Sequence, residues 1–124
     1  METIMVIGIG GFIGANVRYW LSLWAAETFG NRFPWGTLII NVSGSLILAV
    51  FVAYAFNHTT LDPRLRLLLA VGFCGAYTTF STYAVDSVAL IQAGDWMGGL
   101  SNIIVTNVVC IISVIIGLIL GSRL

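Results

Sequence analysis

The sequence predicts an all-α integral membrane protein with four transmembrane helices, and three observations predict it. Of its 124 residues, 59% are apolar and only 8% are charged, and the mean hydropathy is +1.02. A soluble domain carries charge on roughly 25% of its residues. The charges also divide the chain into apolar segments near the ~20 residues that cross ~30 Å of hydrocarbon. Because a chain this short normally forms one domain, we expect a single transmembrane domain over residues 1–124.

The four helices are expected at about 3–26, 36–56, 67–91 and 97–121. The joints between them contain Gly, Asn, Pro and Trp, which interrupt helices or favour membrane interfaces. These joints are short. No water-soluble catalytic or binding domain fits between the helices.

Charge also limits the partners and the orientation. Five arginines balance five acidic residues and there is no lysine, so no basic field attracts nucleic acid and we expect no nucleic-acid partner. Arg64, Arg66 and Arg123 share one side of the membrane, and Arg32 lies on the other, with Arg18 near it. Such a weak bias is compatible with insertion in either direction.

The first helix contains a glycine-rich run that ends in Gly10, Gly11 and Gly14. Its spacing departs from the dinucleotide-binding fingerprint, because Ile13 occupies the third glycine position. We interpret Gly10 and Gly14 as a small-residue face for close helix packing, and Gly117 and Gly121 in the fourth helix likewise.

Placing the charged side chain of Arg18 at membrane depth costs free energy, so its presence there needs a physical explanation. It is expected near the second interface, where its guanidinium can meet water, Glu27 or a loop carbonyl. The alternative is an electropositive vestibule that draws anions to a pore mouth. Asn41 in the second helix has a similar pair of interpretations: a hydrogen bond between helices, or an amide donor to a permeating anion.

The third helix is predicted to break near the bilayer midplane. Residues 72–83 contain two glycines followed by four hydroxyl residues within five positions, and these weaken a helical ladder. Freed backbone at membrane depth is tolerated only where it faces protein or water. Unwound carbonyls can bind a hard cation, and half-helix N-termini favour anions.

Three residues after the break are candidates for an ion path. Phe80 and Tyr83 are spaced to share a helix face, and the positive edges of their rings could stabilise a small anion. Simple packing explains the same spacing. Asp86 continues this face and could pair with Arg18 or Arg66.

The fourth helix offers Asn102 and Thr106, one turn apart, as further polar lining. Cys74 and Cys110 lie inside helices without metal-site spacing, so we interpret both as small packing residues.

The chain resembles the Fluc (CrcB) family of bacterial fluoride channels over essentially its whole length. The resemblance is carried by residues 10–19, 36–41 and 61–63, and above all by 72–82, which read GFCGAYTTFST. It implies a fluoride-selective channel, not an enzyme, that exports fluoride passively across the bacterial inner membrane as a multi-pass protein. It also implies an antiparallel, dual-topology homodimer with two pores and a central structural sodium ion (Na+).

The resemblance assigns roles by position. The sodium ligands would be the backbone carbonyls of Gly75 and Thr78, while Arg18 stays the vestibule candidate argued from its own position. The resemblance places Asn41, Phe80, Ser81, Thr82 and Tyr83 along the fluoride path, and Thr106 joins them as the polar lining that the fourth helix offers.

The chain departs from the family pattern just after the break. Where the family commonly has Phe, Ser and Glu, this chain has Tyr83, Ala84 and Asp86. The Tyr83 hydroxyl is compatible with conduction if it points along the path and obstructs it if it plugs the pore.

Three alternatives stay open at this point. A small multidrug-resistance-type exporter also has four helices, but it depends on a glutamate inside the first helix, and this chain has only Glu2 and Glu27 near that helix's ends. A membrane-embedded enzyme is disfavoured, since the single His58 lies in a joint and no second carboxylate or thiolate can be placed beside Asp86. A structural scaffold would not need a broken third helix.

Overall fold

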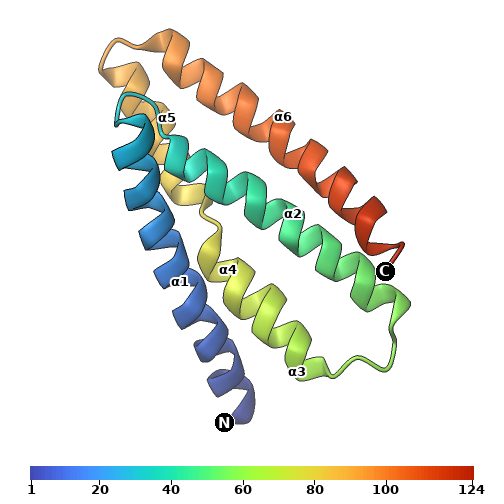
Figure 1. Cartoon of the computed structure of the whole chain (residues 1–124). Helices are drawn as coiled ribbons and strands as arrows, with labels where there is room; N and C mark the ends of the chain where they lie inside the picture. Colours follow the sequence, from blue (N-terminus) through green and yellow to red (C-terminus); the bar gives the residue numbers. More distant parts are fainter.

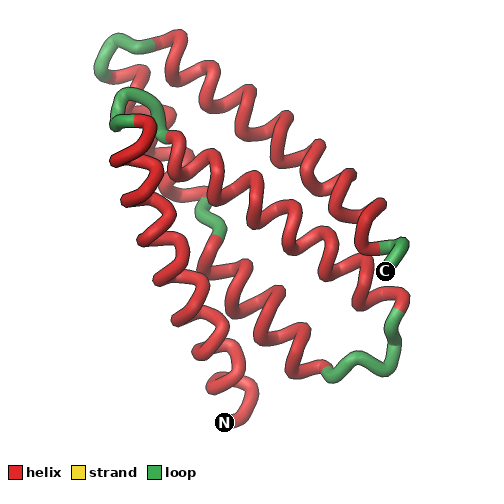
Figure 2. Tube along the Cα trace, viewed as in Figure 1, coloured by secondary structure: helices red, strands yellow, loops and turns green.

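The computed structural model describes residues 1–124, and every regular element in it is a helix (Figures 1 and 2). Four spans are long and apolar enough to cross a membrane, which confirms the predicted fold class. These spans are α1 (Glu2–Phe29), α2 (Trp35–Asn57), a segmented third span (Pro63–Gln92) and α6 (Trp96–Gly121).

The third span is made of four pieces. They are α3 (Pro63–Arg66), η1 (Leu67–Cys74, wound as a π-helix), α4 (Gly75–Tyr77) and α5 (Phe80–Gln92). The span starts earlier than expected because Asp62 caps it: its carboxylate accepts a hydrogen bond from the backbone N–H of Arg64 at 2.9 Å. Pro63 follows in the first turn, where its missing N–H costs nothing.

The predicted break lies at Thr78 and Thr79, between α4 and α5. Thr78 has φ −78° and ψ 155°, and Thr79 has φ −150° and ψ 109°, so both residues are extended. The Thr79 hydroxyl then caps α5 by accepting from the backbone N–H of Thr82 at 3.3 Å. Figure 2 shows the break as a short loop within an otherwise helical span.

The part of the third span before the break lies against α1 (Figure 1). Gly10 and Gly14 are buried there, and a Cβ on either one would collide with a backbone carbonyl, of Leu68 and Phe73 respectively. This confirms the predicted close packing. It is needed because lipid offers no hydrophobic force to hold helices together, so close backbone contact supplies the attraction.

A second close contact joins α2 and α6, which lie side by side in Figure 1. Gly117 and Gly121 are buried against α2, and a Cβ on either would meet the backbone around Leu46 or Val50. The fourth-helix glycine face is therefore also confirmed.

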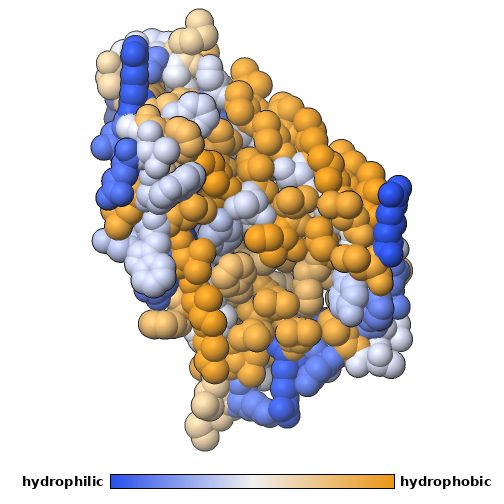
Figure 3. Space-filling view, in the orientation of Figure 1, coloured by the Kyte–Doolittle hydropathy of each residue, from blue (hydrophilic) through white to orange (hydrophobic).

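The outer surface of the molecule is apolar. Only 19 of 124 residues are buried, and large side chains such as Phe12 (72% exposed) and Ile104 (61%) face outwards. Figure 3 shows apolar side chains covering most of the visible face, with hydrophilic residues gathered towards its ends. A soluble monomer rarely exposes such a surface. The distribution fits helices that face lipid or a second subunit.

Candidate ion pathway at the break in the third span

Asn41 bridges α2 to the break. Its Nδ2 donates to the carbonyl of Thr79 at 3.0 Å, and its Oδ1 accepts from the N–H of Thr79 at 2.8 Å. The amide thus pairs both backbone groups of Thr79 at the break. This is the hydrogen bond between helices that the sequence suggested, and the second N–H of the amide is not used in it.

The break also removes the regular donors to two carbonyls. In a continuous α-helix the Gly75 carbonyl would accept from the N–H of Thr79, and the Thr78 carbonyl from that of Thr82. Here the Thr79 N–H binds Asn41, and the Thr82 N–H binds the Thr79 hydroxyl. Gly75 is exposed at the surface of the chain. Two backbone oxygens therefore lose their α-helical donors, and one of them belongs to the exposed Gly75.

A cavity of about 240 Å³ lies beside the break. It brings together four of the residues predicted for the ion path, namely Asn41, Phe80, Tyr83 and Thr106. Backbone and side chains from α2, α5 and α6 meet there, so three spans shape one cavity.

The two aromatic rings are in contact at this cavity. The ring centroids of Phe80 and Tyr83 are 5.4 Å apart, with planes inclined at 56°. Phe80 is 76% exposed, whereas Tyr83 is only 8% exposed. One ring is thus buried in the chain and the other is presented outwards.

Ser81 and Thr82 lie on the other side of α5 and do not line this cavity. Their hydroxyls surround that of Thr79, at 3.3 Å for Ser81 and 3.0 Å for Thr82, and both residues are exposed. Thr82 lines a larger cavity at the end of the bundle.

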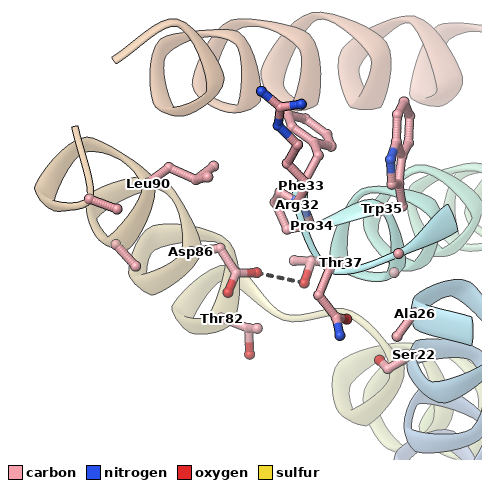
Figure 4. Close-up of a pocket in the computed structure, with 15 residues that line it drawn as sticks. Ser22, Ala26, Arg32, Phe33, Pro34, Trp35, Thr37, Thr82, Asp86 and Leu90 are labelled. Atoms are coloured by element: carbon pink, nitrogen blue, oxygen red, sulfur yellow. Dashed lines mark hydrogen bonds between the residues drawn. The ribbon is translucent and has the colours of Figure 1, made fainter. Parts of the chain in front are cut away.

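That larger cavity, of about 440 Å³, is bounded by the loop at 30–34 and by α1, α2 and α5 (Figure 4). On its wall, Thr37 Oγ1 donates to a carboxylate oxygen of Asp86 at 2.8 Å. Neither Arg18 nor Arg66, the two partners that the sequence left open, pairs with Asp86. Arg66 instead donates to the carbonyl of Ala55 at 2.9 Å, and Figure 4 shows Arg32 extending away from the carboxylate.

Arg18 is half-buried and lines neither cavity. It forms no ion pair with Glu27, because the one ion pair of the chain joins Glu2 and Arg64 at 2.8 Å. Its place in a vestibule stays a prediction.

Several polar residues of the site were not singled out from the sequence. Asn107 donates from Nδ2 to the Tyr83 hydroxyl at 2.7 Å. Ser45 also lines the smaller cavity, as does Cys110, which we interpret from the sequence as a packing residue. A detectable signal was available for Asn107, since it is a second amide in an apolar span, immediately after Thr106.

Asn102 is fully buried in a polar chain between α5 and α6. Its Nδ2 donates to Ser87 Oγ at 2.9 Å, and its Oδ1 accepts from Thr106 Oγ1 at 3.2 Å. Asn102 does not line the cavity. The Thr106 proton is consequently committed to Asn102, and only its oxygen lone pairs and methyl group remain for the cavity.

A model of the family described as "CrcB-like protein, Camphor Resistance (CrcB)" matches residues 5–118. The chain is similar to proteins named fluoride-specific ion channel FluC. That of Koribacter versatilis is 45% identical over 109 residues, covering 88% of this chain and 86% of the relative. Those of Sorangium cellulosum and Sulfurihydrogenibium sp. are each 40% identical over 124 residues, covering 100% of this chain and 98% and 100% of theirs.

The chain belongs to the CrcB family. The resemblance inferred from the residues is thereby confirmed. CrcB relatives carry the name of an ion channel and not of an enzyme, which confirms that this chain is no enzyme. With four spans, it is a multi-pass protein of the bacterial inner membrane.

CrcB membership also disfavours the multidrug-exporter alternative. The carboxylate that such an exporter would need inside the first span is absent, because the two glutamates of α1 lie at its ends: Glu2 is exposed and paired with Arg64, and Glu27 is exposed in the last turn. The polar residues of this CrcB chain converge instead on the break in the third span.

Proposed function

We propose that this protein is a fluoride-selective ion channel that lets fluoride leave the bacterial cell passively. The observation that carries the proposal is the 240 Å³ cavity, where an amide donor and two aromatic rings meet beside the broken third span. Fluoride is small and strongly hydrated, so a pore must replace lost water with hydrogen-bond donors and positive ring edges. The relatives named fluoride-specific ion channels support the same conclusion.

Each predicted pathway or vestibule residue has a chemical role in this proposal. Asn41 offers its unused N–H to the anion, and Phe80 and Tyr83 offer their ring edges. Thr106 shapes the cavity wall. Ser81 and Thr82 add hydroxyl donors on the exposed side of α5, and Arg18 raises the anion concentration at a vestibule.

The functional unit in this proposal is an antiparallel homodimer with two pores. The exposed Phe80 ring and the exposed Gly75 would be covered by a second copy of the chain. The weak arginine bias allows the two copies to insert in opposite directions.

A sodium ion would sit between the two copies and supply a fixed positive charge that holds them together. The donor set fits this ion. The Gly75 and Thr78 carbonyls are hard oxygen ligands that lack their α-helical donors, and the chain has no cluster of His, Cys, Asp or Glu for a transition metal. One chain offers too few ligands, so both copies must contribute.

Passive export would relieve fluoride toxicity. Hydrogen fluoride is a weak acid that crosses the membrane uncharged and dissociates in the more alkaline cytoplasm. A channel then lets the trapped anion flow out. Deleting the gene should sensitise cells to fluoride, most strongly in acidic medium, and no sensitisation in a strain lacking other exporters would contradict the export role.

The decisive test is fluoride release from sodium-loaded liposomes that contain the purified protein, followed with a fluoride electrode. We expect fast fluoride release and no chloride release from matched chloride-loaded vesicles. Folded dimeric protein that releases no fluoride, with Phe placed at position 83 as well as with Tyr83, would overturn the proposal. Repeating the test with sodium replaced by a larger cation examines the sodium site separately.

A further inference from the structure

The Tyr83 hydroxyl is held by a residue that the proposed function does not use. Asn107 on α6 donates from Nδ2 to the Tyr83 oxygen at 2.7 Å. The phenol ring is 8% exposed, so its hydroxyl has few positions open to it. Both residues line the 240 Å³ cavity together with Asn41 and Phe80.

The direction of this hydrogen bond is fixed by a second contact. The same Asn107 nitrogen lies 2.7 Å from the backbone carbonyl of Ile103, which can only accept. That atom must therefore be the amide nitrogen, and its two protons go to Ile103 and to Tyr83. The Tyr83 oxygen accepts, so its own proton is not spent on Asn107.

Tyr77 shows the opposite arrangement. Its hydroxyl lies 2.7 Å from Ser43 Oγ. The Ser43 hydroxyl donates its proton to the backbone carbonyl of Ile39 at 2.7 Å. Tyr77 must then donate to Ser43, and its proton is used inside the bundle. No residue of the chain accepts from Tyr83, whose proton remains free to bind something in the cavity.

We infer that Asn107 is a positioning residue that holds the Tyr83 hydroxyl as a hydrogen-bond donor to fluoride in the cavity. The inference rests on the proposed function and adds a donor and its support to it. The amide N–H polarises the phenol oxygen, which strengthens the O–H as a donor. Fluoride gains most from such a donor because it is the halide with the highest charge density.

A simpler role for Asn107 would be to satisfy a buried hydroxyl that serves only packing. The two roles differ when Tyr83 is replaced. A packing role predicts that Tyr83→Phe leaves fluoride flux unchanged. A donor role predicts that it lowers the flux, since a hydrogen bond to a charged group is lost.

The test is a double-mutant cycle on fluoride flux in liposomes, with Tyr83→Phe, Asn107→Leu and the double variant. We expect Tyr83→Phe to lower the flux about tenfold and Asn107→Leu to lower it by a smaller factor. If Asn107 acts through the hydroxyl, the double variant should match Tyr83→Phe alone. Asn16→Leu is the matched control. Like Asn107, Asn16 donates from its side-chain amide to a carbonyl of its own helix, that of Phe12 at 2.7 Å, but it forms no hydrogen bond to another side chain.

Every outcome decides the inference. Unchanged flux in Tyr83→Phe overturns it, and so does a double variant that is slower than Tyr83→Phe, since Asn107 would then act independently of the hydroxyl. An Asn16→Leu loss equal to that of Asn107→Leu would show a general effect of removing an amide. If the unmutated protein releases no fluoride from the liposomes, the proposed function itself is overturned, and this inference falls with it.

Discussion

The two parts of the third span are held to the bundle by different interactions. Before the break, η1 and α4 contact α1 through glycines, with backbone against backbone at Gly10 and Gly14. After the break, α5 is joined to α6 through polar side chains, with Ser87 bonded to Asn102 and Tyr83 to Asn107. The first arrangement tolerates no added atom, and the second depends on particular polar groups.

The glycine-packed half of the third span acts as a scaffold, and the half joined to α6 by polar side chains carries the candidate site. Close backbone packing holds the first half of the span against α1 at Gly10 and Gly14, and Tyr77 of this half also donates to Ser43 on α2. The other half carries every predicted pathway residue of the span, from Phe80 to Tyr83, and its hydrogen bonds orient them. Changes before the break should therefore abolish folding, whereas changes at or after it should alter stability and flux by smaller steps.

Gly10→Leu should give the largest effect. Its Cβ would collide with the carbonyl of Leu68 and lie 2.9 Å from the backbone N of Phe73, and neither backbone atom can move aside cheaply. We expect a loss of about 3 kcal/mol or more and little folded protein. The measurement is the yield of monodisperse protein by size-exclusion chromatography in detergent.

The matched control is Gly8→Leu on the same helix. A Cβ at Gly8 meets nothing within 4 Å, and the position is exposed, so this variant should keep its yield. Equal yields for the two variants would show that α1 does not need close contact with the third span.

Asn41→Leu should have an intermediate effect. It removes the amide that pairs both backbone groups of Thr79 at the break, where water is scarce. We expect about 2 kcal/mol of lost stability, read as a lower unfolding temperature in detergent, together with reduced fluoride flux. Asn57→Leu is the comparison, since Asn57 lies on the same helix but its amide bonds the exposed carbonyl of Ser122. Similar losses in both variants would mean that the break does not depend on Asn41.

The sequence was sufficient to predict the parts of the fold that depend on composition. Charges marked the four spans, and the run of glycines and hydroxyl residues from Gly72 to Thr82 marked the break. Even the early start at Pro63 follows from a visible signal, an aspartate cap before a proline.

The partners of single polar residues were beyond sequence reasoning. Asp86 bonds Thr37, which is 49 positions away, because α2 and α5 cross with those two faces together. The rotation of each helix about its axis decides such pairs, and no local spacing reveals it. Helix rotation also decides the partner of Thr106, whose hydroxyl donates its proton to Asn102 and not into the cavity.

Glu2→Gln should have the smallest effect, even though it removes the only ion pair of the chain. Glu2 and Arg64 meet at 2.8 Å where α1 and α3 begin, but their side chains are 66% and 62% exposed. Water and salt screen such a pair, so we expect a loss of at most about 0.5 kcal/mol in thermal unfolding. Asp62→Ala is the reference variant, because Asp62 contacts the backbone of the same Arg64 as a helix cap and its removal should cost about 1 kcal/mol. If Glu2→Gln were the more damaging of the two, the attachment of the third span to α1 would depend on charge as well as on glycine packing.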